Sequence, residues 1–313
     1  MTFFDINTTG DDVLKHFYVY AEGKTFVITG PSEMASEPSL QSHSHLQTPR
    51  KLFSLAELKS VRQAAEKIKT LTDKINIFIS NAGVMAVKHY ATSVEGVESQ
   101  FAANYLGHFL LTNLLAKEIV AAASEGARIV QVGSLGYQLG ETHIEDINFK
   151  DGETYNPWIA YGQAKTAMLL FNLALDKRLK QKGITALICH PGVTLESKLL
   201  VNSSVDNDSF VDAYVLAIKR NDGKKPASPT SHGDFEASSR SRAFHGSESI
   251  SNRSETPNPE SAHPLTLNST EAAPAFIVEN EIYTETKEYA LNEETAEGLW
   301  KLSEKLVGET FVY

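Results

Sequence analysis

Four short apolar runs, each followed by a turn of small or polar residues, constrain the fold of this chain more than any other feature. They span residues 24–30, 75–80, 128–132 and 185–189. Runs of this length have the composition of buried strands, and helical periodicity fills the segments between them. Strands that alternate with helices predict an α/β fold with a doubly wound parallel sheet. Ligands bind such sheets at the carboxyl ends of the strands, where Asn81, Ser134 and Gly192 are predicted to lie.

A phenol and an ammonium lie four residues apart in the predicted helix over residues 158–178, as Tyr161 and Lys165. Residues at this spacing share one face of a helix. An ammonium near a phenol stabilises the phenolate and lowers the pKa of the phenol toward the neutral range. This is the chemistry of a carbonyl reductase or an alcohol dehydrogenase. The pair alone is common in helices, so its meaning depends on the motifs around it.

Those motifs follow a known order along the chain. They are Asn81-Ala82-Gly83, Asn104 within residues 104–109, Ser134, Tyr161 with Lys165, and Pro191-Gly192. With them the chain resembles the short-chain dehydrogenase/reductase family. Residues 160–167 and 299–304 are similar to its branch of retinol dehydrogenases and WW-domain oxidoreductases, which includes fungal reductases of secondary metabolism. The resemblance implies a single Rossmann-like domain over residues 1–313. It also implies an NADP(H)-dependent oxidoreductase that reduces a carbonyl or oxidises a secondary alcohol, with NAD not excluded.

The resemblance also implies roles for individual residues. Tyr161 is expected to protonate the carbonyl oxygen, and Lys165 to lower the pKa of Tyr161 and hold the nicotinamide ribose. Ser134 is expected to bind the substrate oxygen. Asn104, on a helix predicted over residues 93–123, is expected to hold a water that relays protons to Lys165. The expected catalytic residues are therefore Ser134, Tyr161, Lys165 and Asn104.

The expected cofactor-binding residues show one departure from the family pattern. They are Gly30, Asn81, Tyr161, Lys165, Val193 and Thr194. After Gly30 the family has a glycine-rich turn that lets a helix N-terminus approach the pyrophosphate. Here Glu33, Met34 and Ser36 follow, and the next glycine is Gly83. Residues 31–53 are predicted to form an atypical loop, because they are too few for the strands and helices that they replace.

The remaining segments are predicted from local patterns. Residues 54–57 have the pattern of a capping box at the start of a helix that runs to about residue 71. Residues 219–273 are polar and aperiodic, which predicts a disordered insert, and residues 199–219 are the candidate substrate lid. A strand over residues 275–283 and a helix over residues 293–306, capped by Asn292, are predicted to follow.

Composition limits the function classes. A net charge of -10 argues against general nucleic-acid binding, and no apolar run is long enough to span a membrane. One cysteine, Cys189, excludes an intramolecular disulfide. His43 and His45 lack a clear third ligand, so no metal site is predicted. With no signal-peptide pattern at the start, we expect a cytoplasmic protein with a small-molecule carbonyl or alcohol substrate. A homodimer or homotetramer is expected from the family.

Two interpretations stay open from the sequence. The first is the active oxidoreductase described above. The second is a catalytically inactive relative, either a pseudoenzyme or a mis-spliced product, that is unable to bind dinucleotide. The intact Ser134, Tyr161 and Lys165 favour the first, and the missing glycines favour the second.

Overall fold

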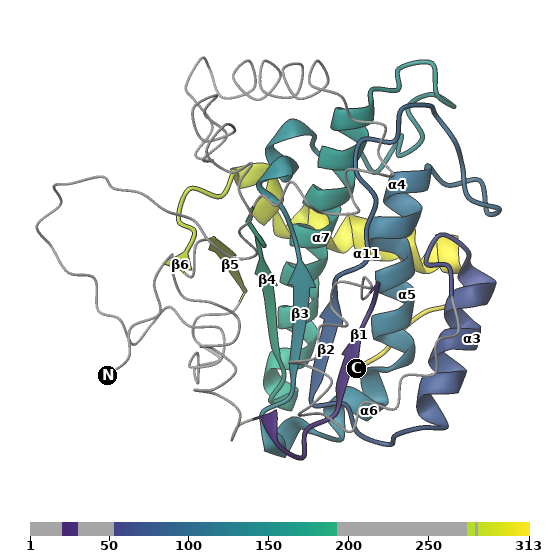
Figure 1. The fold of residues 1–313 in the computed structure, drawn as a ribbon. Helices are drawn as coiled ribbons and strands as arrows, with labels where there is room; N and C mark the ends of the chain where they lie inside the picture. The colour runs from purple at the N-terminus through teal and green to yellow at the C-terminus, as the bar shows by residue number, and fades with distance from the viewer. Residues whose placement is uncertain (1–20, 31–52, 193–273, 279–280) are drawn as a thin grey trace, which may run out of the picture.

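A six-stranded sheet forms the centre of the molecule (Figure 1). The structure, a computed structural model, describes residues 21–30, 53–192, 274–278 and 281–313. The strands lie in the order β1 (Phe26–Ile28), β2 (Ile77–Ser80), β3 (Arg128–Val132), β4 (Thr185–Cys189), β5 (Ala275–Val278) and β6 (Glu281–Ile282). Strands β1 to β5 are parallel, and β6 is antiparallel to β5. The predicted α/β class with a parallel sheet is confirmed, and β3 and β4 match their predicted ranges residue for residue.

The single strand predicted over residues 275–283 is wrong, because the chain reverses within it. Ile277 pairs with Ile282 and Val278 pairs with Glu281 in antiparallel register. Only two residues separate the last of these pairs, which is the length of a tight hairpin connection. An apolar run interrupted by polar residues does not show whether the chain continues or turns back.

The predicted capping box at residues 54–57 is also wrong. Helix α3 spans Leu58–Lys69, and its N-cap residue Glu57 makes no side-chain capping hydrogen bond. Instead the carboxylate of Glu95 accepts a hydrogen bond of 2.8 Å from the backbone N–H of Leu58. The Ser54 N–H donates to the Ser60 hydroxyl. A side chain 37 residues away therefore caps this helix, a tertiary contact that local sequence does not reveal.

The long helix predicted over residues 93–123 is shorter and broken. It begins with α4 (Ser99–Phe101) and continues through a π-helical turn, η2 (Ala102–Leu106), into α5 (Gly107–Leu114) and α6 (Ala116–Val120). The Glu98 carboxylate accepts hydrogen bonds from the backbone N–H groups of Gln100 (2.9 Å) and Phe101 (2.8 Å). This cap fixes the helix start several residues later than predicted. The π-turn carries Asn104.

Two helices end close to their predicted boundaries. Helix α7 spans Pro157–Leu179 and is capped by Asn156, while α11 spans Glu293–Val307 and is capped by Asn292 as predicted. Most side chains of α7 are buried around its whole circumference. Short helical turns complete the described elements: η3 (Ala123–Glu125), η4 (Leu135–Leu139), η5 (Lys180–Lys182) and η6 (Glu288–Leu291).

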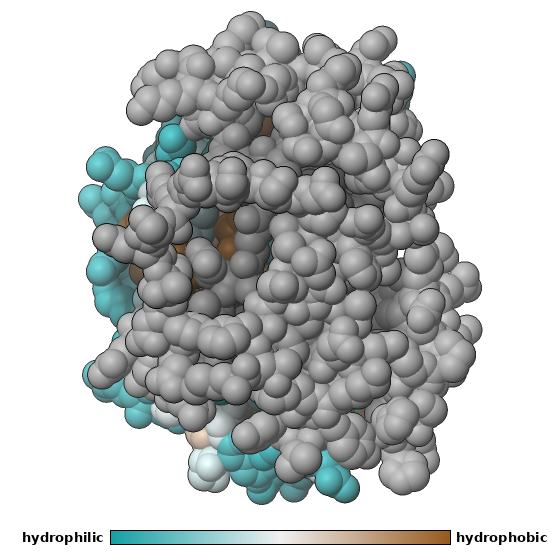
Figure 2. All heavy atoms as spheres, turned by 60° about the vertical axis from the view of Figure 1, so that its left-hand side comes forward, coloured by the Kyte–Doolittle hydropathy of each residue, from teal (hydrophilic) through white to brown (hydrophobic). Residues whose placement is uncertain are grey.

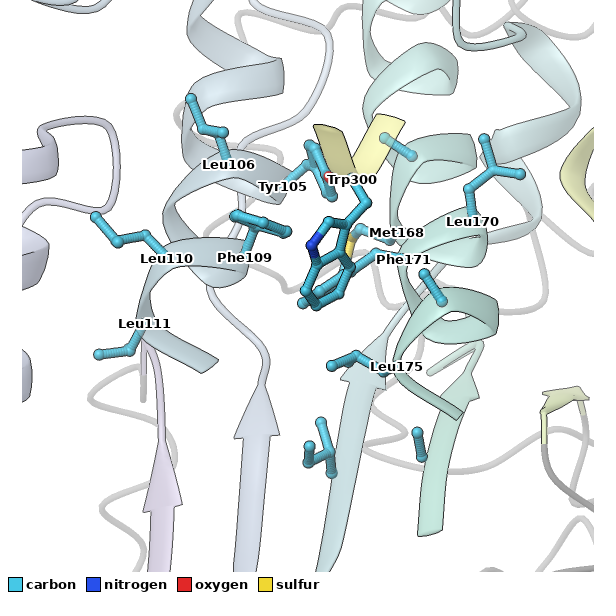
Figure 3. Packing of buried hydrophobic residues seen from close by; sticks show 14 of the residues in the cluster. Tyr105, Leu106, Phe109, Leu110, Leu111, Met168, Leu170, Phe171, Leu175 and Trp300 are labelled. Atoms are coloured by element: carbon cyan, nitrogen blue, oxygen red, sulfur yellow. The ribbon is translucent and has the colours of Figure 1, made fainter. Parts of the chain in front are cut away.

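Aromatic packing fixes α11 across α5 and α7 (Figure 3). The Trp300 ring on α11 lies 5.0 Å from the Phe109 ring on α5 and 5.9 Å from the Phe171 ring on α7, between centroids. The Arg178 guanidinium lies 3.8 Å from the Trp300 ring centroid and forms a bidentate ion pair with Glu297. These contacts combine apolar burial with a cation–π interaction. They join three helices on one face of the sheet.

The opposite face is less covered by the described residues. Phe26 and Ile28 on β1 are 37% and 46% exposed, and a separate small cluster of Leu187, Ala275 and Ile277 lies on β4 and β5. Figure 2 views the molecule from the side of β5 and β6, where some of the visible described residues are hydrophobic.

The order of the described strands bears on where a ligand can bind. Because they follow one another in sequence order, β1 is the terminal strand. Doubly wound sheets bind ligands where the strand order reverses, and the described strands contain no such reversal. The loop predicted over residues 31–53, apart from Phe53, and the insert predicted over residues 219–273 lie outside the described residues.

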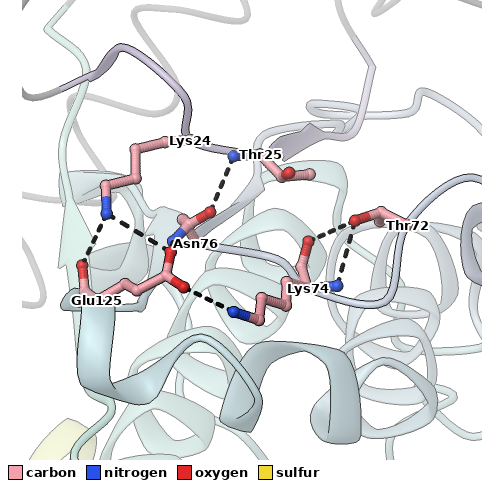
Figure 4. Close-up of polar contacts among 6 residues, drawn as sticks. All are labelled: Lys24, Thr25, Thr72, Lys74, Asn76 and Glu125. Carbon is pink, nitrogen blue, oxygen red and sulfur yellow. Dashed lines mark hydrogen bonds and ion pairs between the residues drawn. The ribbon is translucent and has the colours of Figure 1, made fainter.

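A polar network ties the amino ends of the strands together, at the edge opposite the carboxyl ends (Figure 4). The Glu125 carboxylate lies 2.8 Å from the Lys74 ammonium and accepts a hydrogen bond from the Asn76 amide. The Asn76 amide oxygen in turn accepts from the backbone N–H of Thr25. Hydrogen bonds from Lys74 and Asn76, with the positive charges of Lys74 and Lys24, lower the Glu125 pKa to about 2. Together with the backbone ladder between β1 and β2, this network ties the start of the edge strand to the loop before β2.

Replacement of Trp300 by Ala should destabilise the fold strongly, because it removes the ring that contacts Phe109, Phe171 and Arg178. We expect a loss of about 3–5 kcal/mol in the free energy of unfolding, measured by urea denaturation. Val312→Ala, at a side chain that is 96% exposed, is the matched control and should change the free energy by less than about 0.5 kcal/mol. Equal effects of the two substitutions would contradict this account of α11.

Candidate functional site

The structure brings Ser134 and Tyr161 together at the carboxyl edge of the sheet. Ser134 follows β3 in extended conformation and caps η4, and its hydroxyl oxygen accepts a hydrogen bond of 3.0 Å from the backbone N–H of Gly136. Since that bond uses a lone pair, the hydroxyl hydrogen of Ser134 remains available. A hydrogen bond from Ser134 stabilises the Tyr161 phenolate and lowers the pKa of Tyr161. The two side chains therefore act as one polar unit.

The position of η4 is fixed by the helix that carries Tyr161. The Thr166 hydroxyl on α7 lies 3.0 Å from the Tyr137 carbonyl oxygen and 2.6 Å from the Gly140 carbonyl oxygen. Both bonds are buried. A Cβ atom at Gly136 would lie 2.6 Å from a ring carbon of Tyr161, so the chain needs glycine where it crosses this ring. The turn after β3 and the start of α7 are thus mutually positioned.

Tyr161 lies against an apolar wall. Its ring packs with Ala86, Leu139 and Trp158, with Met85 at the edge of the cluster. Burial is the largest effect on its pKa and outweighs the hydrogen bond from Ser134, so the pKa of Tyr161 is raised to about 12. At neutral pH the phenol is protonated and is a proton donor.

Lys165 lies one helical turn further along α7. Its Nζ is 5.7 Å from the centroid of the Tyr161 ring and donates a hydrogen bond of 2.9 Å to the Val132 carbonyl oxygen. The sequence predicted that Lys165 lowers the Tyr161 pKa, whereas the pKa is raised in this structure. The reason is that burial dominates at Tyr161 while the ammonium is directed to the backbone of β3. Burial also lowers the Lys165 pKa to about 8.

Asn104 is buried in the π-turn, and its polar atoms are already engaged. Its side-chain oxygen accepts from the Val84 N–H (2.7 Å), and its side-chain nitrogen donates to the Val84 carbonyl (2.9 Å). Its backbone carbonyl lies 2.8 Å from Nδ1 of His108. A water held by Asn104 would therefore have to use the second lone pair of its backbone carbonyl, or the second N–H or second lone pair of its side-chain amide.

Gly30 and Asn81 meet where β1 and β2 end. The Asn81 amide donates to the carbonyl oxygens of Thr29 (3.0 Å) and Gly30 (3.1 Å), while its own backbone N–H donates to the Thr29 hydroxyl. Gly30 has a φ of 59°, and a Cβ there would lie 2.6 Å from the Ala82 side chain. Asn81 thus fixes the conformation of the turn that would lie against a bound cofactor. Val193 and Thr194 lie outside the described residues.

Sequence reasoning missed three groups near this edge. Thr29 precedes Gly30 and contacts both Asn81 and His108, and His108 lies within the motif that starts at Asn104. His190 follows β4, and neither of its buried ring nitrogens has a hydrogen-bond partner among the described residues. Burial, with the nearby charge of Lys165, lowers the pKa of His190 to about 4. The sequence did contain a signal for these residues. Thr29 lies at the end of a predicted strand, His190 directly follows another, and His108 lies within the motif that starts at Asn104.

Within the described ranges, no cluster of three or more His, Cys, Asp or Glu side chains could hold a metal ion. His43 and His45 lie outside these ranges. Among the described helices, none has the length and apolar character needed to cross a membrane.

Comparison with known proteins connects this geometry to a family. Residues 16–146 match the family model for short chain dehydrogenases. Over 141 residues the chain is 43% identical to human retinol dehydrogenase 13. This match covers 45% of this chain and 41% of that protein. Over 142 residues it is 38% identical to short-chain dehydrogenase/reductase prx1 of Penicillium roqueforti, with coverage of 45% and 41%.

The match to these relatives is partial. The chain spans about half the length of the curated relatives it matches. Among solved structures, an uncharacterized protein of Mycobacterium paratuberculosis is similar in fold, with a TM-score of 0.56 and 23% sequence identity. That likeness covers 94% of this chain and 96% of the other.

Replacement of Lys165 by Met should stabilise the fold at neutral pH. The folded state binds the Lys165 proton less tightly than the unfolded state, so the cost of the buried charge is fully present below pH 8 and disappears as pH rises through 10.5. Removing the charge relieves a cost of about 3 kcal/mol, and losing the hydrogen bond to Val132 cancels part of that gain. The free energy of unfolding should therefore rise by about 1–2 kcal/mol. Urea unfolding at pH 7 measures it, and a destabilised variant would refute the buried cation.

Gly136→Ala should destabilise the protein by about 1–3 kcal/mol, because the new methyl group displaces the Tyr161 ring. The same substitution made in a Tyr161→Ala background should cost at least about 1 kcal/mol less, since the obstructing ring is gone. A double-mutant cycle of unfolding free energies measures the difference. Additive effects would mean that Gly136 is required for a reason other than its contact with Tyr161.

Proposed function

We propose that this chain, which is similar to short chain dehydrogenases over residues 16–146, is an NADP(H)-dependent oxidoreductase of the short-chain dehydrogenase/reductase family, in its retinol-dehydrogenase-like branch. The proposed reaction reduces a carbonyl group to an alcohol, or oxidises a secondary alcohol in reverse. One observation carries the proposal: Ser134, Tyr161 and Lys165 meet at the carboxyl edge of the sheet, with a protonated phenol next to an available hydroxyl and a buried cation.

The residues of this edge fit the nicotinamide end of a dinucleotide. When bound, reduced nicotinamide supplies a hydride to the carbonyl carbon. Among the described residues, no atom lies within 4 Å of a Cβ built at Gly192, and the His190 imidazole and the Lys165 ammonium provide polar groups nearby. The part of the site that would hold the pyrophosphate includes residues outside the described ranges. The proposed cofactor-binding residues are Gly30, Asn81, Tyr161, Lys165, Val193 and Thr194.

The chemistry assigned to the chain is the movement of one proton. The Tyr161 hydroxyl donates its proton to the substrate oxygen as the carbon receives the hydride, so that C=O becomes CH–OH. The Ser134 hydroxyl, which donates to Tyr161 in this structure, would donate instead to the substrate oxygen, orient it and stabilise the charge that develops there. The phenolate left behind is a stronger base than the Lys165 amine, because the pKa of Tyr161 is about 12 and that of Lys165 about 8. Return of a proton from Lys165 to Tyr161 is therefore favourable.

The apolar wall around Tyr161 favours a substrate with an apolar group beside its carbonyl. Trp158 meets the Tyr161 ring edge to face, with 6.4 Å between centroids, and Met85 is only partly buried. An apolar substituent packed on these side chains would leave the carbonyl oxygen facing the Tyr161 and Ser134 hydroxyls.

The finer assignments rest on the family resemblance alone. They are the preference for NADP over NAD and a role in secondary metabolism. A cytoplasmic location, expected from the composition, is also part of the proposal. A homodimer through the helices that carry Asn104 and Tyr161 is part of the proposal. Because α11 packs on α5 and α7, such an interface would have to include α11.

Tyr161→Phe should abolish turnover, with a fall of at least about 1,000-fold in kcat, because it removes the hydroxyl that donates the proton. The affinity for NADPH should change less than about threefold, since one hydroxyl at the nicotinamide end is lost. Cofactor binding is measured by calorimetry with NADPH and NADH, and turnover by NADPH absorbance with a panel of apolar ketones and aldehydes. Leu139→Met, on the apolar wall, is the matched control and should keep the wild-type rate constant within about tenfold.

Two outcomes would contradict the proposal. A Tyr161→Phe variant that retains a near-full rate would show that Tyr161 is not the proton donor. A folded wild-type protein that binds neither NADPH nor NADH would exclude hydride transfer and would favour an inactive relative.

A further inference from the structure

His108 joins two turns that are distant in sequence and close in space. It is fully buried on α5, with Nε2 2.8 Å from the Thr29 hydroxyl and Nδ1 2.8 Å from the backbone carbonyl oxygen of Asn104. Thr29 follows β1 and Asn104 lies in the π-turn. One imidazole thus connects the carboxyl end of the edge strand to the helix that starts behind it.

Hydrogen-bond accounting fixes which ring nitrogen carries the proton. A carbonyl oxygen only accepts, so Nδ1 of His108 must donate to Asn104. In a neutral ring Nε2 is then an acceptor, and the Thr29 hydroxyl must donate to it. That hydroxyl accepts from the backbone N–H groups of Asn81 (2.9 Å) and Ala82 (3.0 Å), which fills its remaining capacity. Only one assignment of donors satisfies all of these bonds: Nδ1 of His108 donates to Asn104, and the Thr29 hydroxyl donates to Nε2.

The ring is held in the neutral form by its surroundings. Burial is the largest effect and lowers the pKa of His108 to about 4, and the charge of Lys165 lowers it further while the bond to Asn104 opposes the shift. A protonated ring would donate from both nitrogens. The Thr29 hydroxyl would then lose its acceptor and would be left with the Ile79 carbonyl, 3.5 Å away.

We propose that His108, as the Nδ1-protonated neutral imidazole, is a positioning residue that ties the Thr29-Gly30 turn and the Asn81-Ala82 turn to the π-turn carrying Asn104. The tie places three segments that would line the cofactor cleft at fixed distances from one another. Its consequence for the cofactor rests on the proposed function, whereas the tie itself does not. Removal of the ring should loosen the turns after β1 and β2 without loosening the centre of the sheet.

The tautomer is tested first, in the wild-type protein without any cofactor. Nitrogen-15 NMR of protein labelled in histidine distinguishes a ring protonated at Nδ1 from one protonated at Nε2, and loss of the signal in His108→Gln assigns it. We expect protonation at Nδ1 at pH 7. Because free histidine prefers protonation at Nε2, observation of that form at His108 would overturn the proposal.

Amide hydrogen exchange tests the tie in a way that general destabilisation does not mimic. In His108→Leu, the amides of Asn81 and Ala82 should exchange at least tenfold faster relative to those of β3. In His108→Gln, whose side-chain amide reaches the Thr29 hydroxyl, this ratio should stay within about threefold of the wild-type value. Thr112→Val, one turn along α5, removes a buried hydroxyl that has no hydrogen-bond partner among the described residues, so it should leave the ratio unchanged. Equal acceleration of β3 and the turn in both His108 variants would overturn the proposal.

NADPH binding separates this inference from the proposed function. If the wild-type protein binds NADPH, His108→Leu should raise the Kd at least tenfold, while His108→Gln and Thr112→Val stay within about threefold. An unchanged Kd in His108→Leu would overturn the positioning role. If the wild-type protein binds no dinucleotide, the proposed function fails, and the tie is decided by the tautomer and the exchange ratio alone.

Discussion

The burial of α7 is the constraint on which the rest of the structure depends. The helix lies under η4, the π-turn and α11, so nearly every side chain on it must find a partner. Apolar residues fill most of the contacts, and Thr166 and Lys165 satisfy backbone carbonyls of the turn after β3 and of β3 itself. The same burial that stabilises the fold therefore fixes the phenol and the ammonium in place, at a cost in desolvation that only buried hydrogen bonds and packing offset.

The buried charge of Lys165 organises the electrostatics of the carboxyl edge. It disfavours protonation of His108 and of His190, and it opposes the effect of burial on the Cys189 thiol, whose pKa is raised to about 11. Burial is the larger effect on both imidazoles, and together with the Lys165 charge it keeps them neutral near pH 7. Among these described groups, Lys165 is the cation and the hydroxyls and imidazoles around it are neutral, an arrangement suited to a substrate whose oxygen becomes negative during the reaction.

The edge position of β1 limits the site from the other side. Its partner β2 and the network around Glu125 hold the strand, and Thr29 and Asn81 order the turn that follows. The described strands nevertheless show no reversal of order, so the crevice that usually receives a dinucleotide has only one of its walls in this part of the chain. The nicotinamide end of the site is consequently better defined than the adenosine end.

The sequence by itself determined the strands from β1 to β4, helix α7 with its Tyr161 and Lys165, and the cap of α11 by Asn292, because each depends on local periodicity or a local hydrogen bond. Tertiary structure decided what distant groups control. Glu95 replaced the local cap of α3, the chain reversed between β5 and β6, and burial raised the Tyr161 pKa that spacing alone predicted to fall. The same holds for His108, because its tautomer depends on a carbonyl of its own helix and a hydroxyl 79 residues away. Local sequence specifies which groups are available, and packing sets the dielectric environment and the partners that determine their chemistry.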